Sequence, residues 1–409
     1  MKIAAFHLMP YRNLPPDFEK KYKSAWFDLP FREVADPNLC AQYYNWTLDE
    51  LTFCAESGFD GVCTNEHHQN AYGFMVNPNI MGSVLARATR GKDTAIIQLG
   101  ETAVFLNPPI RVAEEYAMLD CISEGRMVAG FPVGLGGDFA YSYGMAPMTQ
   151  RGRYREAHDL IKKAWTADEI FAWNGKYYQL PMVNIWPRPV QQPHPPIWVP
   201  GNASPSTWDF VINNDYSYCY LTYFGAKGAT HMVEGYWNRV EELGRDRNPY
   251  RMGFLVPVGV SETDAQAEAE FGRHIEYFYH KGLRIPEQYL LPPGHMTHSS
   301  LTHLLTKRPF PPYEDLQKMR FRHFDENDFL VAGSAATVVE RLLHIIKTLR
   351  VGHLMILPQY GSMSHEQTME NIERIAKSVL PHLRNVWDDE GWEDHWWPQT
   401  REKAQRAAA

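Results

Sequence analysis

Apolar and polar positions follow two alternating patterns along most of the chain. Short, nearly continuous apolar runs are followed by longer stretches in which apolar residues recur every three or four positions. The first pattern is typical of buried strands and the second of amphipathic helices. On this basis we predict strands at 2–9, 61–64, 95–106, 127–132, 196–200, 216–221, 254–260 and 352–357.

A helix is predicted after each of these strands. The first spans 47–57, where Leu48, Leu51 and Ala55 share one face and Gly58 stops the helix. The others are expected at 79–90, 111–121, 152–165, from about 206, 230–243, 265–280 and 366–379. Strands separated by helices pair in parallel, and eight such strands are the number that closes a barrel. The sequence therefore predicts an α/β fold of the TIM (β/α)8 barrel type.

Two segments interrupt this repeat. The first, at about 171–195, contains an Asn174-Gly175 turn between aromatic flanks, which predicts an inserted β-hairpin followed by a proline-rich extended connection. The second, at about 284–328, is also rich in proline and long for a structureless loop, and such loops are usually lids or binding elements. We expect one barrel domain over residues 1–381 that carries both insertions.

The C-terminal tail, residues 382–409, is rich in tryptophan among acidic residues. Because the indole ring is amphipathic, we expect these side chains to pack on the barrel exterior or on a partner chain rather than to bind a ligand. They are Trp387, Trp392, Trp396 and Trp397.

Composition narrows the class of protein. The 409 residues are 44% hydrophobic and 22% charged, which is ordinary for a soluble globular protein. A net charge of −8 argues against a nucleic-acid partner, so small molecules are the expected ligands. The chain contains no uninterrupted run of about 18 apolar residues, so no membrane span is predicted. The N-terminal residues do not resemble a signal peptide, so we expect a cytoplasmic protein. Five widely spaced cysteines predict neither disulfides nor a thiolate zinc site.

The run from Gly61 to His68 is the first candidate for chemistry. A short predicted strand ends there in Glu66, His67 and His68. Catalytic residues of (β/α)8 barrels lie at the C-terminal ends of strands, where the loops vary on a rigid support. The triplet could also be ordinary polarity of a solvated loop.

Four blocks of sequence stand in order within residues 1–225. They are Gly58-Phe59-Asp60 before Asn65-Glu66-His67-His68, Leu119-Asp120-Cys121-Ile122-Ser123-Glu124-Gly125-Arg126 before Val128-Ala129-Gly130, Pro187-Arg188-Pro189-Val190-Gln191, and Pro195-Pro196-Ile197-Trp198-Val199-Pro200-Gly201. In these blocks and their order the chain resembles the bacterial-luciferase-like flavin-dependent monooxygenases. Each block alone is weak evidence, and together they are strong.

The resemblance implies a TIM-type barrel that binds reduced FMN (FMNH2), reacts it with O2 and transfers one oxygen atom to a small substrate. The many aromatic and methionine side chains suggest an apolar or aromatic substrate, although the same side chains could equally be barrel core. The resemblance also implies a separate NAD(P)H-dependent flavin reductase as partner, and a homo-oligomer, either a dimer or a dimer of dimers. Luciferase has an arginine in the loop after the fourth strand, whereas this chain has none between Phe131 and Gly137. The pattern is therefore closer to hydroxylating or Baeyer–Villiger-type relatives such as limonene monooxygenase.

Particular residues are implicated by their place in the resemblance. His67 aligns with a proton-transfer group, and imidazole suits that role at neutral pH. Glu66 is expected to orient His67 or to bond to nearby backbone, and His68 to be structural. Thr102 and Ala103, at the end of the third strand, are expected against the isoalloxazine ring.

A phosphate cradle is predicted directly after the fifth strand. Glycine lets the backbone approach and hydroxyls add donors at a helix start, although the same residues could simply cap that helix. Two further phosphate contacts are expected from the helix after the fourth strand, a guanidinium and a phenol hydroxyl. These candidates are Gly201, Asn202, Ser204 and Ser206, with Arg151 and Tyr154. Substrate contacts are expected from His7, Met9 and Asn107.

Three alternatives remain open from the sequence. A deazaflavin-dependent dehydrogenase of the same fold would move hydride without oxygen. A metal-dependent hydrolase would use Glu66, His67, His68 and His7 as ligands, but adjacent histidines on an extended segment point to opposite sides, so no metal is expected. A noncatalytic homologue would bind no usable flavin.

Overall fold

The computed structural model describes residues 1–102, 107–135, 137–202, 204–221, 224–286, 289, 292, 294–307 and 313–399. Eight parallel strands form a closed barrel in this part of the chain, in the order β9-β11-β1-β2-β3-β4-β7-β8, and pairing of β8 with β9 closes it. The strands are β1 (Lys2–Phe6), β2 (Gly61–Thr64), β3 (Ala95–Gln98), β4 (Met127–Gly130), β7 (Ile197–Gly201), β8 (Ser217–Tyr220), β9 (Met252–Ser261) and β11 (His353–Leu357). The predicted barrel is confirmed.

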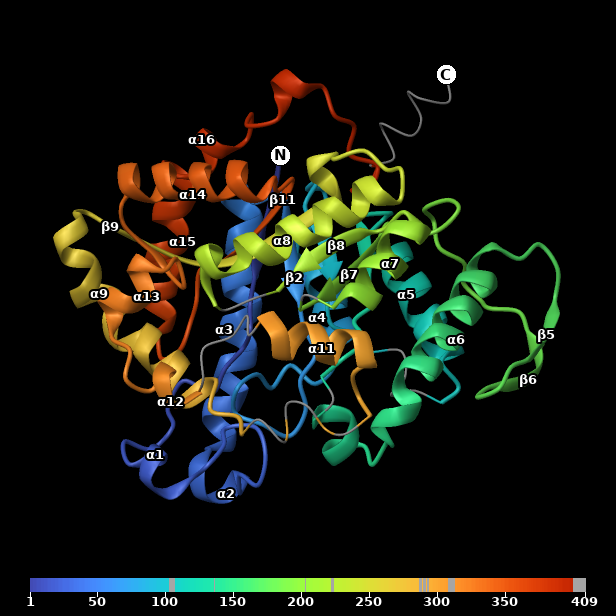
Figure 1. The fold of residues 1–409 in the computed structure, drawn as a ribbon, viewed down its shortest axis with the longest axis horizontal. Coiled ribbons are helices and arrows are strands. Elements are labelled where there is room, and N and C mark those ends of the chain that lie inside the picture. Colours follow the sequence, from blue (N-terminus) through green and yellow to red (C-terminus); the bar gives the residue numbers. More distant parts are fainter. Residues whose placement is uncertain are drawn as a thin grey trace.

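Helices surround the barrel (Figure 1). The long ones are α3 (Pro37–Glu56), α4 (Pro78–Ala88), α5 (Ile110–Ile122), α6 (Pro147–Thr166), α7 (Pro205–Asn214), α8 (Gly225–Glu242), α9 (Asp264–Tyr277), α14 (Ala335–Leu349) and α15 (His365–Ser378). The helix predicted at 47–57 is only the second half of α3. Asp36 caps the true start, where its carboxylate accepts from the Asn38 backbone N–H at 2.8 Å and Pro37 occupies the first turn.

The buried apolar side chains form two large clusters that follow the two faces of each strand. Ile3 and Ala5 of β1 belong to the cluster shared with the helices, while Ala4 and Phe6 belong to the other cluster. Because successive side chains of a strand point to opposite faces, the first cluster lies between barrel and helices and the second lies inside the barrel. This double burial is why the strands read as continuous apolar runs.

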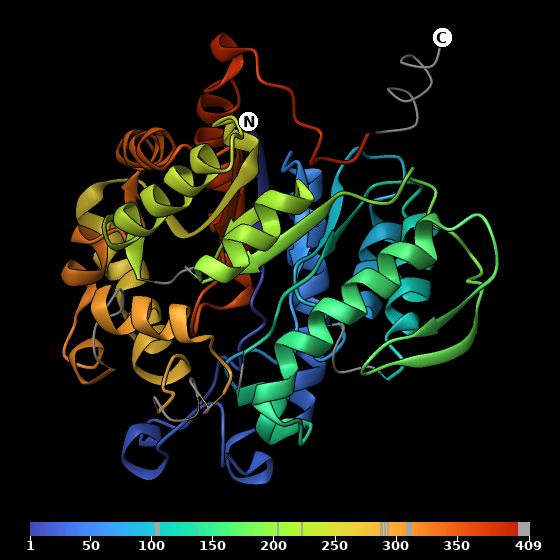
Figure 2. The ribbon, with the colours of Figure 1, turned by 45° about the vertical axis from the view of Figure 1, so that its right-hand side comes forward.

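Several segments extend the barrel. The predicted hairpin is present as β5 (Phe171–Asn174) and β6 (Gln179–Val183), which pair antiparallel and stand at the edge of the molecule beside α6 (Figures 1 and 2). A ninth parallel strand, β10 (Val331–Ser334), was not predicted and pairs with the C-terminal half of β9. The insertion at 284–328 is not simply irregular, since its described part contains three short helices. They are α11 (His298–Lys307), α12 (Tyr313–Leu316) and α13 (Phe321–Glu326).

The C-terminal tail packs across the N-terminal end of the barrel. After α16 (Leu380–Leu383), Trp397 lies against the rings of Trp198 and His353, with centroids 5.8 Å and 5.7 Å away. Trp198 donates its indole N–H to the Trp396 carbonyl at 2.8 Å. Residues 400–409 lie outside the described part. None of the described helices is both long and apolar enough to cross a membrane.

Candidate active site

The C-terminal ends of the strands bring together the loops that hold most of the predicted site residues. A short N-terminal pair of helices, α1 (Phe18–Lys21) and α2 (Phe31–Val34), belongs to the long connection after β1. That connection crosses the loop after β2, because the Ala71 N–H donates to the Ala25 carbonyl at 2.9 Å. It also reaches the segment after α9, because the Ala25 N–H donates to the Arg284 carbonyl at 2.9 Å. Residues far apart in the sequence therefore meet at this end of the barrel.

His67 is held by a carboxylate and two aromatic rings. Its Nδ1 lies 3.3 Å from Asp138 Oδ2, and its side chain is 15% exposed. The ring meets Trp26 and Tyr72 edge to face, with centroids 5.3 Å and 4.9 Å away, and those two rings stack at 4.0 Å. Asp138 begins a short π-helical turn, η1 (Asp138–Ser142), in the loop after β4. Neither Asp138 nor Trp26 was predicted as a site residue.

Glu66 contacts the backbone rather than His67. Its Oε2 accepts from the Thr102 N–H at 2.7 Å, and its Oε1 accepts from His68 Nε2 at 3.0 Å. The other nitrogen of His68 lies 3.1 Å from the Tyr143 hydroxyl, which fits the structural role expected of His68. Of the two expectations for Glu66, the backbone bond is the one observed, while the carboxylate at His67 is Asp138. Glu66 thereby ties the end of β2 to the loop after β3.

The loop after β3 is packed tightly against the end of β2. A Cβ at Gly100 would collide with the backbone of Asn65 and Glu66, so only glycine fits there. Thr102 is 4% exposed, and its backbone N–H is already used by Glu66. Ala103, the other residue expected against the flavin ring, lies outside the described residues.

Glu101 is a buried acid that the sequence did not single out. Burial, followed by the nearby carboxylates of Glu66 and Glu115, raises its pKa well above the ordinary value. The Asn79 amide donates to it and also to Glu115, the latter at 2.9 Å. Burial therefore favours the neutral form of this carboxyl, which lies one residue before Thr102.

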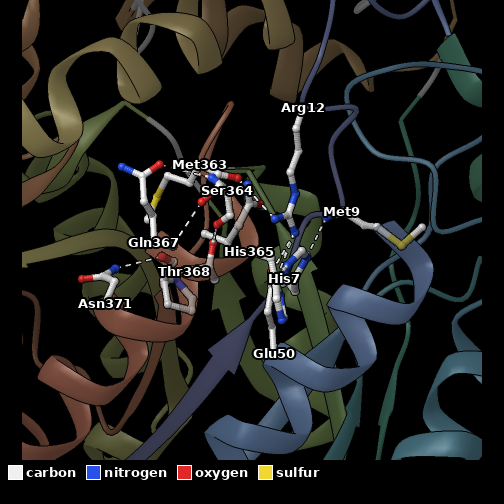
Figure 3. A network of polar contacts seen from close by, with 12 residues as sticks. His7, Met9, Arg12, Glu50, Met363, Ser364, His365, Gln367, Thr368 and Asn371 are labelled. Carbon is white, nitrogen blue, oxygen red and sulfur yellow. Dashed lines mark hydrogen bonds and ion pairs between the residues drawn. The ribbon is translucent and has the colours of Figure 1, made fainter. Parts of the chain in front are cut away.

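His7 and Met9 lie inside the protein at the end of β1 (Figure 3). His7 Nε2 donates to Glu50 at 2.6 Å and Nδ1 accepts from the Met9 N–H at 2.9 Å, so both ring nitrogens are occupied. Each side chain is 1% exposed. Burial lowers the pKa of His7 despite Glu50, which favours the neutral ring. Their role as substrate contacts stays a prediction. The observed bonds do not favour it, because they already occupy both ring nitrogens of His7. Asn107, the third candidate, is exposed before the start of α5.

The predicted phosphate cradle is a compact group of hydroxyls around a guanidinium. Arg151 donates to Ser206 Oγ at 3.0 Å, and Ser204 Oγ lies 3.1 Å from Ser206 Oγ and 2.8 Å from Ser300 Oγ of α11. Arg155 donates to the Ser206 carbonyl at 3.1 Å. Ser204 precedes α7 but makes no capping bond with its side chain. Arg151 and Arg155 form no ion pair with a carboxylate within the described ranges. Hydroxyls, an arginine and a helix N-terminus together suit an anion.

The other cradle candidates differ in position. Gly201 ends β7 and Asn202 is exposed beside it. Tyr154 is 2% exposed, and its hydroxyl donates to the Phe131 carbonyl at 2.8 Å, so a phosphate contact would require breaking that bond. Ser300 was missed because it belongs to a helix that was expected to be irregular loop.

The histidines considered as metal ligands are spread over separate partners. His7 bonds to Glu50, His67 to Asp138 and His68 to Glu66. Within the ranges that the structure describes, no group of three or more His, Cys, Asp or Glu side chains is placed to hold a metal ion.

Comparison with known proteins gives matches over most of the chain. The sequence model of a family described as luciferase-like monooxygenase matches residues 31–351. The chain is 27% identical over 368 residues to a protein of Acinetobacter baylyi named flavin-dependent trigonelline monooxygenase, oxygenase component. That match covers 85% of this chain and 92% of the other protein.

Solved structures show the same fold. One is the oxygenating constituent of 3,6-diketocamphane monooxygenase of Pseudomonas putida, a type II Baeyer–Villiger monooxygenase in complex with FMN. It superposes with a TM-score of 0.66 at 19% identity, over 93% of this chain and 98% of that one. Another is an F420-dependent secondary alcohol dehydrogenase, with a TM-score of 0.62 at 15% identity, over 94% of this chain and 99% of that one.

Proposed function

The chain belongs to the luciferase-like monooxygenase family, and we propose that it is the oxygenase component of a two-component system, which uses FMNH2 and O2 to oxygenate a small aromatic or apolar compound. The observation that carries the proposal is the pairing of two distinct groups at one end of the barrel. One is the arginine and hydroxyl cradle of Arg151, and the other is His67 between a carboxylate and two rings.

The residues at the cradle fit the phosphate of FMN. Arg151 and the hydroxyls of Ser204, Ser206 and Ser300 would hold it, because all four can donate and no carboxylate is paired with the arginine in the described ranges. Asn202 would add an exposed amide. Reduced FMN, when bound, supplies the electrons with which O2 is activated.

His67 is proposed to hold or move a proton during the reaction. The Asp138 carboxylate accepts at Nδ1, which places a proton on Nδ1 and leaves Nε2 to exchange the other one. Trp26 and Tyr72 fix the plane of the ring and keep water from that side. Glu66 acts at one remove, because its bond to Thr102 positions the loop after β3 where the flavin ring is expected.

A separate NAD(P)H-dependent flavin reductase is proposed as the partner. The sequence has no Gly-x-Gly-x-x-Gly turn early in a βαβ unit, so a site for a dinucleotide is not evident. The Acinetobacter relative is also named an oxygenase component. We further infer that the enzyme acts in the cytoplasm, which fractionation of cells against a cytoplasmic marker would test.

A homo-oligomer is proposed from the exposed apolar side chains on two neighbouring helices. Ile80 and Val84 of α4 are 64% and 46% exposed, and Met118 and Ile122 of α5 are 49% and 39% exposed. Each pair is spaced four residues apart and so shares one face of its helix, and exposed apolar side chains gathered in this way are typical of an interface. Light scattering should give at least a dimer, and Ile80→Glu should shift it toward the monomer; a monomeric wild type would contradict the inference.

The test of the proposed function is dependence on the reductase. The purified chain with NADH and FMN should consume neither NADH nor oxygen until a flavin reductase is added, and with the reductase it should slow the reoxidation of reduced FMN by air compared with the reductase alone. Useful consumption of NADH without the reductase would overturn the two-component proposal. Replacing FMN by reduced deazaflavin tests the alternative, since the F420-dependent dehydrogenase shares this fold. Hydride transfer without oxygen in that arm would favour a dehydrogenase.

A further inference from the structure

Asp138 uses only one of its two carboxylate oxygens within the described part of the chain. The side chain is 5% exposed, and Oδ2 lies 3.3 Å from His67 Nδ1. Oδ1 is buried and has no hydrogen-bond partner among the described residues. The histidine is also the only basic side chain paired with Asp138 in those ranges. Leaving a buried carboxylate oxygen without a donor is costly, so the geometry calls for a ligand that supplies a donor or a positive charge.

Two groups of aromatic rings lie near this carboxylate. His67 connects it to the stacked pair of Trp26 and Tyr72. The adjacent Gly137 is so close to Phe27 that an added Cβ would lie 2.5 Å from its ring. Phe27 in turn belongs to a cluster with Tyr141 and Tyr289, in which ring centroids are 5.0–5.3 Å apart. The three pairs are Phe27–Tyr141, Phe27–Tyr289 and Tyr141–Tyr289. The faces of such rings attract cations.

The charged side chains here are opposite in sign to those of the phosphate cradle. Burial, followed by the nearby carboxylates of Glu66 and Asp138, raises the pKa of Tyr143, so both carboxylates lie close to this hydroxyl. Arg12, in the connection after β1, is already neutralised, because it is bonded to Glu50 at 2.9 Å and 3.1 Å. At the cradle the charged side chains are Arg151 and Arg155. A cation at Asp138 and an anion at the cradle would each meet a complementary charge.

We propose that Asp138 anchors the substrate and that the substrate is a flat aromatic compound with a cationic nitrogen. The nitrogen lies at the free carboxylate oxygen, and the ring lies among Trp26, Tyr72 and Phe27. This assignment rests on the proposed function and narrows its substrate class. Asp138 thereby has two tasks, since one oxygen orients His67 and the other holds the charge.

The test measures binding of three probes of similar size by ligand-observed NMR titration. The probes are N-methylpyridinium, which is cationic, toluene, which is neutral, and benzoate, which is anionic. The wild type should bind N-methylpyridinium and bind both other probes more weakly. Asp138→Asn keeps the shape of the side chain. It should weaken binding of N-methylpyridinium by at least about tenfold and leave binding of toluene unchanged. Circular dichroism establishes that each variant is folded.

Two further variants separate the charge of Asp138 from other effects. Glu373→Gln removes one negative charge from an exposed ion pair with Lys377 and should leave all three affinities unchanged. His67→Gln keeps Asp138 charged and should retain binding of N-methylpyridinium. Equal binding of the cation and toluene, tighter binding of benzoate, or a change below about twofold in Asp138→Asn would each overturn the proposal. Loss of cation binding in His67→Gln would also overturn it.

These titrations are made without flavin, oxygen or reductase. If the cation binds through Asp138 but the protein neither binds reduced FMN nor consumes oxygen, the anchor stands and the proposed function falls. If oxygenation is observed with a neutral substrate while the cation does not bind, the proposed function stands and the anchor falls.

Discussion

Glu50 is the negative centre of a buried cluster that joins three parts of the barrel (Figure 3). It bonds to His7 after β1 at 2.6 Å, to Arg12 at 2.9 Å and 3.1 Å, and to His365 at the start of α15 at 3.0 Å. Glu50→Gln keeps the volume of the side chain but removes its charge. The side chains of Glu50 and Arg12 are 1% and 3% exposed, so the guanidinium would remain buried without its counter-charge. Breaking a buried pair in this way costs about 3–5 kcal/mol in free energy of unfolding.

The loss should depend on pH in a defined sense. Burial raises the pKa of Glu50, but Arg12, His365 and His7 outweigh it and lower the pKa to about 2. Its stabilisation is therefore present above the unfolded-state pKa of about 4.3 and is lost as pH falls toward 2. The bond to Glu50 raises the pKa of His365, so that contribution is present below the unfolded-state value of about 6.5 and is lost as pH rises through the raised pKa. The difference between wild type and Glu50→Gln should be largest near pH 5–6.

Urea unfolding of wild type, Glu50→Gln, Arg12→Met and the double variant measures these effects. The double variant should be less unstable than the sum of the single variants, because no charge is then left unpaired. Glu373→Gln, which breaks an exposed pair, is the matched control and should change stability by less than about 1 kcal/mol. A loss below about 1 kcal/mol for Glu50→Gln, or a loss that does not change between pH 6 and pH 3, would refute this reasoning.

The remaining predictions concern the tail and the proton-transfer group. Trp397→Ala should destabilise the protein by about 3–5 kcal/mol, because the 7% exposed indole fills the N-terminal end of the barrel. Trp392 is more exposed, so Trp392→Ala should cost about 1 kcal/mol or less. Equal losses of stability in urea unfolding would contradict the observed packing of the tail. His67→Ala should retain flavin binding but lower the rate of product formation by about 10²–10⁴-fold, and an unchanged rate would show that His67 is structural.

The barrel was predictable because every strand is buried on both faces. Continuous apolar runs as short as that of β2, alternating with longer stretches of helical periodicity, favour buried strands between helices. Ends of elements were less predictable. β3 was expected to reach Leu106 but ends at Gln98, just before the Gly100-Glu101-Thr102 stretch, and β9 continues to Ser261 because β10 offers a second pairing partner. β10 itself was missed, because a four-residue strand after a proline-rich segment has too weak an apolar pattern to be recognised in the sequence.

The candidate site was predictable only where its residues lie close together in the sequence. Glu66 and His67 stand together at a strand end, and Ser204 and Ser206 stand together before a helix. Asp138 follows a glycine-rich stretch with no periodic pattern, and nothing local indicates that it meets His67, 71 residues away. The same holds for Ser300 at the cradle. Such contacts depend on how the loops after different strands cross, which is a property of the tertiary structure.

From the sequence alone, a polar residue that bonds to other buried residues could not be distinguished from one that contacts a ligand. His7 and Tyr154 lie at the positions where a ligand contact was expected, yet both use their polar atoms within the protein. A polar residue at the end of a buried strand suits either role. The Trp-rich tail was similarly open between a partner chain and the barrel, and the structure places it on the barrel.

The most direct test of the central claim is an anaerobic titration with reduced FMN and, in parallel, with reduced riboflavin, which lacks the phosphate. Arg151→Met should weaken binding of reduced FMN by about tenfold or more, which corresponds to the loss of one charged hydrogen bond. It should leave binding of reduced riboflavin unchanged. Arg153→Met is the matched control, since that guanidinium lies over the Tyr177 ring 5.2 Å away, and it should bind both flavins as the wild type does. If Arg151→Met binds reduced FMN as tightly as the wild type, or if neither flavin binds the wild type, the cradle and the flavin-dependent activity proposed for this chain are contradicted.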